Sequence, residues 1–565
     1  MRLIAFLIES IMPNKNSNDA TTSLLIDAAE AGDLESIEGL LIKTAAGKAN
    51  VEVVNQQQKK GKKPDGEEFG GDTPLNVAVG EGHLECVRCL VEKGGADVNY
   101  ADGDGVVPLL VACMSGHLEC VRYLVEKGAD INYRIDGGKT TPLYTAAKMI
   151  FSTPEARKDK GRVEIIRVLL ENGAEASYPF LLAVKDYDVE LCRILLDNGV
   201  DANGVVVVDE LCDFSPLGFA CMSTPGSIEI VSLLLKRGAD ANAYMLYDGG
   251  KVLPLHSAII RASNEEASQR TIGIEHCRAL LDHGADANGV YVDKDNYKTT
   301  PLGRACDRIS SESSICPIET IQLLLKHGAQ VDATFGSSGL TKTPLFCALL
   351  PPNIELCRLL IDNGADVNKT CLDMTNRGQR SIYNPLSCIT CSLREDACDI
   401  MELLLKSGAD PNATFLHKST DVNDTVTPVI YAILWNEPKK LSILLKNGAK
   451  ANTCDKEGLT PLHWAAYSDN AECILILLEH KADIEFPTKG GNSPLWVAKN
   501  KGRHQAVHVL LKNGAKDVDV STAGDGSGLL QEMNRSADKW LSKLAVRALD
   551  EIVVPAATAA CCVVS

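Results

Sequence analysis

The chain has 565 residues, of which 45% are apolar but only 5% aromatic, so large aromatic-centred cores are not expected. Its 57 basic and 75 acidic residues give a formal net charge of −18, which disfavours a nucleic-acid partner because most of the surface repels a polyanion. Charged residues make up 23% of the sequence, and no long apolar stretch is present, so neither general disorder nor a membrane-spanning helix is expected.

The N-terminal residues and the cysteines bear on the cellular compartment. Residues 3–8 are apolar and follow a single Arg2, but no small-residue cleavage site stands close behind them, which disfavours a signal peptide. Residues 1–22 are therefore predicted to be a disordered or apolar leader, with Met1 or Met12 as the start. Most of the 20 cysteines lie inside apolar helical patterns such as residues 84–90, as small buried hydrophobes of a reducing cytosol do.

Self-similarity organises the next part of the chain, from residue 23 to residue 517. The pair Pro-Leu, usually preceded by Thr or Ser, recurs through it, and degenerate copies stand at Pro179 and Pro428. The regular copies begin at Pro74, Pro108, Pro142, Pro216, Pro254, Pro301, Pro344, Pro385, Pro461 and Pro494. The mean interval is about 38 residues, and a sequence close to Gly-Ala-Asp-x-Asn closes most units.

Each marker has a physical role in a helix-turn-helix unit. In Thr460-Pro461, the hydroxyl can cap free backbone amides while proline occupies the first helical turn, so a helix begins there. A second helix follows, with an apolar face such as that of residues 118–125. Gly128 can then adopt the left-handed conformation that ends this helix, and Asn132 favours the turn after it.

These residues resemble the ankyrin repeat. Residues 458–466, Gly-Leu-Thr-Pro-Leu-His-Trp-Ala-Ala, match the signature Thr-Pro-Leu-His-x-Ala of that family, whose period is 33 residues. The resemblance implies an all-α dominated ankyrin-repeat solenoid of about 13 helix-turn-helix units, plus a C-terminal capping helix. Residues 23–44 lack Thr-Pro-Leu and are predicted to form the N-terminal capping unit.

Lengthened loops predict β-hairpin fingers in the middle repeats. A plain unit has nine residues from its closing Asn to the next Pro, as from Asn99 to Pro108, whereas the middle units have 12 to 17. Because apolar and polar residues alternate in these loops, they are predicted to be hairpins lying side by side, interrupted at Ser177 where no room for a finger exists. The finger residues expected to contact a partner are Tyr244, Tyr247, Tyr291, Tyr297, Phe335 and Phe415.

Other insertions lie outside the fingers. Residues 150–161, 261–273 and 307–316 fall between the two helices of a unit and are predicted to be tolerated loops. Residues 45–72, which include a Gln- and Lys-rich run, are predicted to be a flexible insertion in the first finger, with a basic docking element as the alternative.

Apolar residues near the end of the first helices are the candidate partner-binding set. In the ankyrin family these positions face the concave surface that binds partners, and apolar residues in water favour a surface meant to be covered. The alternative is that the lengthened fingers fold over them. The set is Met114, Met149, Met222, Ile260, Leu350, Leu434, Trp435 and Tyr467.

No motif for catalysis, a cofactor or a metal is evident. Cys86-x-x-Cys89 and Cys388-x-x-Cys391 have half the spacing of a zinc site, but no second pair is in phase with them, so core packing is the preferred interpretation. By resemblance to the family, His83, His117, His256 and His463 are expected to support loops through hydrogen bonds. The sequence has no phosphate-binding loop, His-Glu-x-x-His or nucleophile elbow, so we expect no enzymatic activity.

The tail adds a predicted lipid anchor. Residues 529–553 form an amphipathic pattern of balanced charge, predicted to cap the last repeat, with a membrane-surface helix as the alternative. The ending Cys562-Val563-Val564-Ser565 is a Cys-aliphatic-aliphatic-X motif that favours prenylation of Cys562, and Cys561 is placed for palmitoylation.

We therefore expect a monomeric scaffold or adaptor that binds proteins at the cytosolic face of a membrane. A soluble adaptor with an accidental tail is the closest alternative, followed by an effector that delivers bound proteins to a modifying enzyme such as a ubiquitin ligase, and by an enzyme subunit. The predicted divisions are 1–22 (leader), 23–44 (cap), 45–72 (insertion), 73–517 (array), 518–528 (linker), 529–553 (helix) and 554–565 (tail with the lipidation motif).

Overall fold

The architecture is that of a computed structural model. It describes residues 17–45, 54–55, 61–62, 68–69, 72–135, 140–151, 160–209, 212–222, 228–247, 250–264, 266–293, 296–307, 318–337, 340–373, 381–392, 394, 396–419, 422–455, 457–517, 529, 531 and 533. The chain divides into two compact units, one of Met1–Val208, Asp213–Ala220 and Glu229–Ala239, and the other of Asp209–Cys212, Cys221–Ile228 and Asp240–Ser565.

The described residues form a succession of helix pairs, which confirms the predicted helical repeat array. The N-terminal pairs are α2 (Ser17–Glu30) and α3 (Leu34–Ala45), α5 (Pro74–Gly80) and α6 (Leu84–Glu92), α7 (Pro108–Ser115) and α8 (Leu118–Glu126), α9 (Pro142–Phe151) and α10 (Lys160–Glu171), α11 (Ser177–Lys185) and α12 (Val189–Asp197), and α13 (Pro216–Met222) and α14 (Ile228–Lys236). We call the first helix of each pair the inner helix and the second the outer helix.

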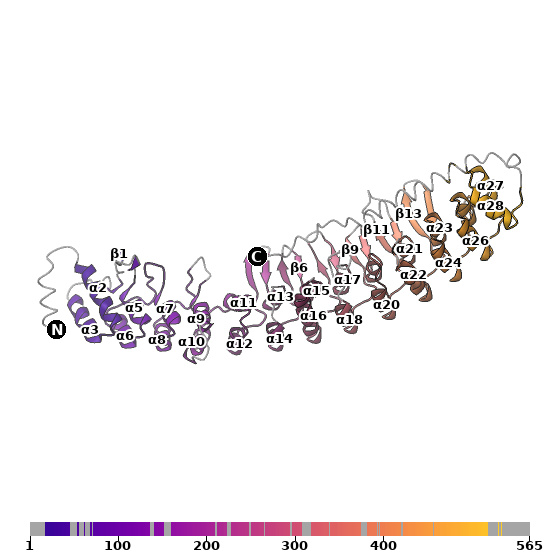
Figure 1. The fold of residues 1–565 in the computed structure, drawn as a ribbon. Helices are drawn as coiled ribbons and strands as arrows, with labels where there is room; N and C mark the ends of the chain where they lie inside the picture. Colours follow the sequence, from indigo (N-terminus) through magenta and orange to yellow (C-terminus); the bar gives the residue numbers. More distant parts are fainter. Residues whose placement is uncertain are drawn as a thin grey trace. The chain divides into compact units, whose positions relative to one another are not determined.

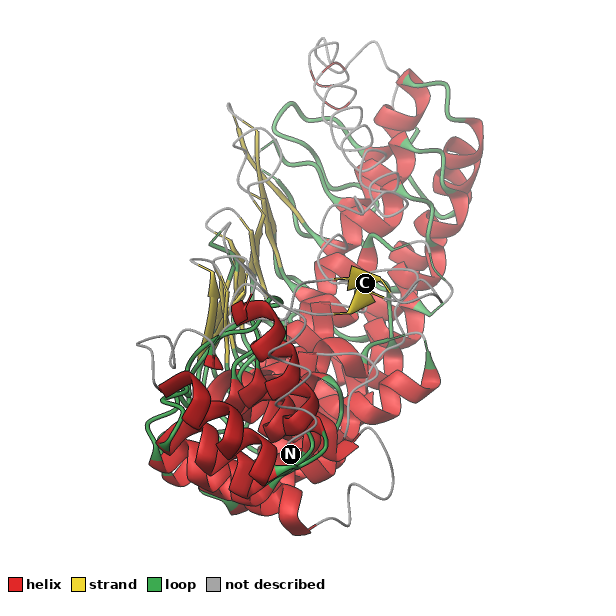
Figure 2. Ribbon diagram, turned by 90° about the vertical axis from the view of Figure 1, so that its left-hand side faces the viewer, coloured by secondary structure: helices red, strands yellow, loops and turns green. Residues whose placement is uncertain are grey.

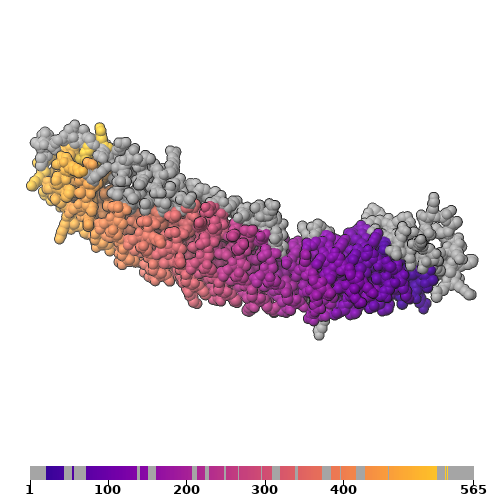
Figure 3. Space-filling model, turned by 180° about the vertical axis from the view of Figure 1, so that it is seen from behind, coloured from indigo at the N-terminus to yellow at the C-terminus, as the bar shows by residue number. Residues whose placement is uncertain are grey.

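The second unit continues the same arrangement. Its pairs are α15 (Pro254–Ala262) and α16 (Ala267–Asp282), α17 (Pro301–Asp307) and α18 (Ile318–Lys326), α19 (Pro344–Ala348) and α20 (Ile354–Asp362), α21 (Pro385–Thr390) and α22 (Ala397–Lys406), α23 (Pro428–Leu434) and α24 (Pro438–Lys446), α25 (Pro461–Tyr467) and α26 (Ala471–Glu479), and α27 (Pro494–Asn500) and α28 (His504–Lys512). Within each unit the pairs stack in chain order (Figure 1), and the colour bands of the surface follow the sequence (Figure 3).

Local chemistry starts and ends these helices as the sequence predicts. The hydroxyl of Thr73 accepts the backbone N–H of Asn76 at 3.1 Å, and Pro74 occupies the first turn of α5. Gly128 follows the outer helix α8 with a φ of 86°, a left-handed conformation that a side chain would strain. At the start of α8, the ring of His117 lies 2.9 Å from the carbonyl of Gly80 and so ties this repeat to the preceding inner helix.

Asparagines join successive repeats into a ladder. Asn288 donates its Nδ2–H to the carbonyl of Gly328 at 3.0 Å, and its Oδ1 accepts the backbone N–H of Gln330 at 2.7 Å. The same donation to the next repeat is made by Asn99, Asn132, Asn203, Asn242, Asn368, Asn412 and Asn452. Because Asn99, Asn132, Asn242, Asn368, Asn412 and Asn452 also accept a backbone N–H of the following repeat, the closing Asn of the sequence motif links repeats.

The predicted fingers are present and form a continuous sheet in the second unit. The strands are β5 (Met245–Tyr247), β6 (Gly250–Val252), β7 (Tyr291–Val292), β8 (Lys298–Thr299), β9 (Phe335–Ser337), β10 (Leu340–Lys342), β11 (Cys371–Asp373), β12 (Ser381–Tyr383), β13 (Phe415–Ser419) and β14 (Val422–Val426). They lie in chain order, and neighbours pair antiparallel both within and between fingers. The strands form a layer beside the helices (Figure 2).

The first unit has fewer strands. Strand β3 (Val206–Asp209) pairs with β4 (Cys212–Phe214), and β1 (Gly61–Lys62) pairs with β2 (Glu68–Phe69) inside the insertion of the first finger. As predicted, α11 begins at Ser177 with no finger before it. The inner helices of each unit lie between the strands and the outer helices (Figure 1).

The predictions for two insertions, residues 261–273 and residues 45–72, are wrong in part. Residues 261–273 are not a loop, because most of them extend α16 toward its N-terminus, so that this outer helix has 16 residues. In the insertion 45–72, the side chain of Val54 is fully buried and Asn55 accepts the backbone N–H of Asp97 at 3.0 Å, so the segment packs on the repeats at this point.

The C-terminal segment is described only in part. Leu529, Gln531 and Met533 are helical, and the side chain of Met533 is fully buried. The rest of the predicted capping helix 529–553, the linker 518–528 and the tail 554–565 lie outside the described residues. The leader, apart from the start of α2, also lies outside them.

Candidate functional site

The candidate partner-binding residues all lie at or just beyond the last turn of an inner helix. Met114, Met149, Met222, Ile260, Leu434 and Tyr467 belong to α7, α9, α13, α15, α23 and α25, while Leu350 follows α19 and Trp435 follows α23. We call this set of eight residues the inner-surface set. The helical repeat explains why equivalent residues of successive units fall at equivalent places within a unit.

The inner-surface set is only partly open to solvent. Met114 has 46% of its surface exposed, whereas the other seven side chains are half-buried. A half-buried apolar side chain contributes to packing and still presents apolar area to a partner. Thus Met114 is the strongest candidate of the set in the first unit.

Tyr467 shows how the second unit surrounds an inner-surface residue with cations. The Lys501 Nζ lies 4.8 Å and the Arg503 Cζ 5.9 Å from the centre of the Tyr467 ring, and Arg503 also donates from Nε to the Tyr467 carbonyl at 2.8 Å. The ring packs edge-on against Trp464. Both cations come from the following repeat, so this aromatic residue is held by cation–π contacts between repeats.

The finger residues divide into those that support the array and those that face solvent. Phe335 is 2% exposed and lies so close to Gly303 that a Cβ there would be 2.6 Å from its ring, so it packs the finger onto α17 and does not belong to an accessible surface. Tyr244 is 53% exposed. Tyr247 and Phe415 lie on β5 and β13, and their side chains lie outside the described part of the structure.

Tyr297 and Tyr291 are half-buried and engaged with the helices. The Tyr297 hydroxyl donates to the Asp307 carboxylate at 2.8 Å, and the Lys342 ammonium donates to the other oxygen of the same carboxylate at 2.8 Å. Burial, followed by the Asp307 charge, raises the pKa of Tyr297 well above its ordinary value, so the hydroxyl stays protonated. The Arg304 guanidinium lies 5.5 Å from the ring centre of Tyr291.

Two buried histidines support loops, as the resemblance implies. The Nδ1 of His463 accepts the backbone N–H of Thr460 at 3.1 Å, and its Nε2–H donates to the Asn492 carbonyl at 3.1 Å. Burial lowers the pKa of His463 to about 4. Burial, and then the nearby Arg304 charge, lowers the pKa of His256 to about 3, so both rings are neutral at physiological pH.

Three of the four paired cysteines are buried, and Cys391 is half-buried. Cys86, Cys89 and Cys388 are buried, and burial raises the pKa of the Cys86 and Cys89 thiols. Within the described residues, no three His, Cys, Asp or Glu side chains are grouped closely enough to hold a metal ion. The sulfur atoms therefore contribute to packing at these positions.

Sequence reasoning missed a buried lysine. The Lys440 ammonium, on the outer helix α24, donates to the carbonyls of Thr390 and Ser392 at the end of the inner helix α21, and lies 3.9 Å from Glu437. Like His117 in the first unit, it donates from the start of an outer helix region to a carbonyl at the end of the preceding inner helix, although it stands three residues later in the repeat. Lys440 directly follows Lys439 in the sequence, and no signal there separates the buried lysine from its neighbour.

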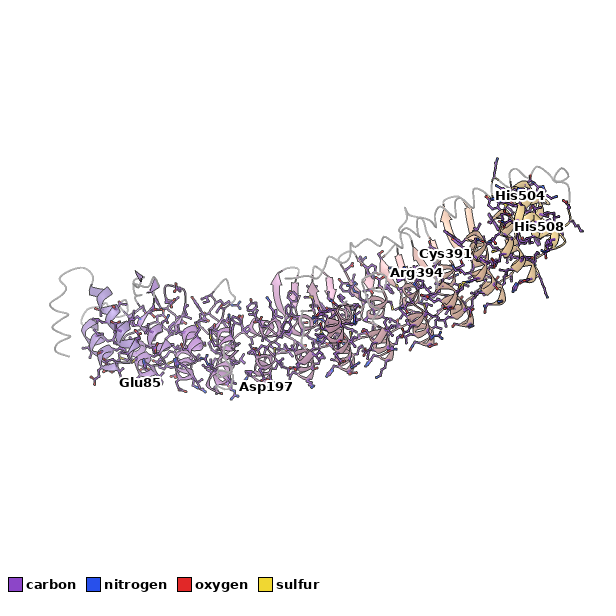
Figure 4. The ribbon with its side chains drawn as sticks, viewed as in Figure 1. Glu85, Asp197, Cys391, Arg394, His504 and His508 are labelled. Atoms are coloured by element: carbon purple, nitrogen blue, oxygen red, sulfur yellow. The ribbon has the colours of Figure 1, made fainter. Side chains whose placement is uncertain are left out.

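The outer helices carry the charged surface. Glu85 and Asp197 lie on the side away from the fingers (Figure 4), where Asp197 pairs with Arg237 at 2.5 Å and Glu85 with Arg88 at 3.8 Å. Exposed pairs of this kind contribute at most about 1 kcal/mol each. The chemical contrast with the apolar inner-surface set favours the inner face as the binding face.

Family comparison supports the repeat assignment. Residues 42–135, 95–178, 155–245 and 429–522 match a family model of three ankyrin repeats, and residues 340–369 match a model of one ankyrin repeat. Together these matches cover more than half of the chain. Among the described residues, no helix is both long and apolar enough to cross a membrane.

Several curated proteins are similar to part of this chain. The human transient receptor potential cation channel subfamily A member 1 is 31% identical over 186 residues, which are 31% of this chain and 15% of the channel subunit. Inversin of Canis lupus familiaris is 31% identical over 171 residues, 30% of this chain and 14% of inversin. Palmitoyltransferase AKR1 of Lachancea kluyveri is 33% identical over 122 residues, 20% of this chain and 15% of that protein. The match therefore spans a small part of each relative.

Proposed function

Because the chain belongs to the ankyrin-repeat family, we propose that it is a non-enzymatic scaffold or adaptor that binds a protein partner through its inner-surface set. The observation that supports this most is an apolar residue six positions after the proline that opens the inner helix in six repeats, those of α7, α13, α15, α19, α23 and α25, with Met114 46% exposed. A repeat array needs no apolar residue there for folding, whereas a protein partner gains from covering one.

The test compares two pairs of exposed or half-buried apolar residues. Met114→Ser with Leu434→Ser alters the inner-surface set. Leu475→Ser with Leu511→Ser alters outer helices at residues that are 43% and 38% exposed. Partner proteins captured from host cells by the tagged full chain are quantified by mass spectrometry for both double variants and the parent.

We expect the inner-surface variant alone to lose partners. Equal loss in both variants, or no loss in the inner-surface variant while its melting temperature matches that of the parent, would overturn the proposal. A variant that melts far earlier is replaced by the single Met114→Ser, because this side chain is the most exposed of the set.

A lipid anchor at Cys562 is the second part of the proposal, and the support for it is the motif Cys562-Val563-Val564-Ser565 alone. In this reaction the thiol sulfur would form a thioether with a prenyl diphosphate, diphosphate would leave and the thiol proton would be released. One prenyl chain binds membranes reversibly, so Cys561 is proposed to carry a second, palmitoyl chain. The anchored protein would then lie on the cytosolic face of a membrane.

Intact-mass measurement of the protein from a eukaryotic host tests the anchor. A mass increase that Cys562→Ser removes, together with a move from the membrane fraction to the soluble fraction, is the expected result. An unmodified parent, or a Cys562→Ser variant that stays in the membrane fraction, would leave the soluble adaptor as the better account.

A further inference from the structure

The finger sheet of the second unit has two chemically different faces. Met245 and Val252, which are paired across the first finger, are 1% and 8% exposed, and Thr299 and Phe335 on later strands are 1% and 2% exposed. These residues form the face that packs on the inner helices. Successive residues of a strand point to opposite faces of the sheet. The residues next to these four along each strand therefore lie on the opposite face, which we call the outer face.

Cross-strand pairing places one row of residues along this outer face. Lys251 is opposite Val292, Val292 is opposite Lys298, and Lys298 is opposite Gly336, across β6, β7, β8 and β9. The part of this row that contains both lysines runs from Leu246, which pairs with Lys251, to Thr341, which pairs with Gly336, and the sheet continues on both sides of it. From Leu246 to Thr341 the row contains two lysines and no acidic residue, in a chain whose net charge is −18.

A second row, nearer the helices, adds apolar area. Tyr244 and Val290 are each 53% exposed, and each stands two residues before a member of the first row. The Lys251 Nζ lies 4.7 Å from the centre of the Tyr244 ring. Lys251 and Lys298 are exposed, and neither forms an ion pair with a carboxylate among the described residues.

We propose that these five residues, Tyr244, Lys251, Val290, Val292 and Lys298, form a docking surface for an acidic, extended segment of a partner protein. We call them the outer-sheet patch. It is distinct from the inner-surface set, because the sheet itself separates its side chains from the inner helices. Cations beside exposed apolar side chains favour a segment that carries both carboxylates and apolar residues.

The spacing of the two lysines defines the segment further. They stand on strands separated by one intervening strand, about 10 Å apart at the usual distance between strands. In a polyproline II segment, residues three apart share a face and are separated by about 9.3 Å along the axis. An acidic residue at every third position, with apolar residues between, would therefore place one carboxylate near each lysine and an apolar side chain over Val292.

The test uses synthetic peptides and the full chain. The probe is a fluorescein-labelled peptide of four Glu-Pro-Leu repeats, and its isomer of equal composition has the four glutamates in one block. Fluorescence anisotropy is measured with the parent, with Lys251→Glu/Lys298→Glu, and with Lys326→Glu/Lys446→Glu. The last variant has the same change in charge, placed at the exposed ends of the outer helices α18 and α24.

We expect the repeating peptide to bind the parent more tightly than the block isomer does. Lys251→Glu/Lys298→Glu should weaken binding by about tenfold or more, Tyr244→Ala by roughly threefold, and Lys326→Glu/Lys446→Glu by less than about twofold. The Met114→Ser/Leu434→Ser variant should bind the peptide as the parent does, so failure of the inner-surface proposal and failure of this one remain distinguishable.

Three results would overturn the proposal. Equal binding of the two isomers, or equal loss in the two charge-reversal variants, would mean general electrostatic attraction. No binding of the peptide at about 1 mM protein would exclude a useful affinity. Binding of phosphatidylserine vesicles that depends on Lys251 and Lys298, without binding of the peptide, would assign the surface to a membrane.

Discussion

Glycine at position 273 decides how closely the two helices of its repeat approach. A Cβ placed on Gly273 would lie 2.2 Å from the backbone nitrogen of Ala262, nearer than any real contact. The position is helical and its φ is ordinary, so the requirement is for space and not for a left-handed backbone. In the sequence this glycine ends the insertion 261–273, which was predicted to be a loop, so the extension of α16 was missed.

Gly273→Ala should lower the free energy of unfolding by about 1 to 3 kcal/mol, because either α15 or α16 must shift to admit the methyl group. Gly39→Ala is the matched control, since no atom lies within 4 Å of a Cβ at this position in α3. There the helix propensity of alanine should leave stability unchanged or raise it by up to about 1 kcal/mol. Urea denaturation measures both, and equal stability of the two variants would contradict the close approach.

His463 should make stability depend on pH. The folded-state pKa is lowered to about 4, whereas the unfolded chain titrates near the ordinary value of about 6.5. Between these values the unfolded state binds the extra proton, so stability is complete above about pH 6.5 and is lost as the pH falls toward 4, by about 3 kcal/mol in total. Protonation of Nδ1 also removes the acceptor of the Thr460 N–H.

Denaturation of the parent and of His463→Gln at several pH values measures this effect. The variant should lose less stability than the parent between pH 6.5 and 4, because one buried histidine no longer needs to be protonated on unfolding. His256 acts in the same direction and remains in both proteins. Identical pH profiles would show that the His463 ring is accessible to protons in the folded state.

At the level of the repeat, the asparagine ladder links elements that lie far apart in sequence. Asn288→Ala removes one donor and one acceptor between two repeats, and the amide of Gln330 loses its partner. We expect a loss of about 1 to 2 kcal/mol and faster hydrogen exchange at Gln330. Unchanged protection of this amide in the variant would show that the ladder does not hold the next repeat.

Much of this element-level structure could be predicted. The helix starts, the left-handed glycines and the finger hairpins follow from residue types at fixed spacing, and loop length alone separated fingers from plain turns. The sequence did not predict which face of the sheet each finger residue occupies. A shift of one residue exchanges the two faces, and the register of each strand on the helices depends on tertiary packing. Phe335 illustrates this, since it was predicted together with Tyr244 to contact a partner but is buried.

Contacts between residues of different repeats could not be predicted from the sequence either. Tyr297, Asp307 and Lys342 meet only because consecutive fingers stack, and Lys440 is buried only because the preceding inner helix ends beside it. The inner-surface set was predicted as a group from the repeat, but its partial burial depends on how neighbouring units pack.

In a repeat array, the free energy of unfolding is approximately the sum of the stability of each repeat and of its interfaces with neighbouring repeats. Within the first unit, the pair α11 and α12 follows a turn with Ser177 where most other repeats have the closing Asn, and no finger precedes it. Hydrogen exchange with mass spectrometry should therefore show lower protection in α11 and α12 than in α7 and α8. Equal protection would mean that helix packing alone holds each unit.

The central claim, that a protein partner covers the inner surface, is tested most directly by site-specific photo-crosslinking in host cells. A photoreactive amino acid is placed at Met114 or Leu434 on the inner helices, and at Glu85 or Asp197 on the outer helices (Figure 4). The account predicts that Met114 and Leu434 each yield a crosslinked partner protein and that Glu85 and Asp197 do not. Crosslinks to a common partner from Glu85 and Asp197, with none from Met114 or Leu434, would contradict it.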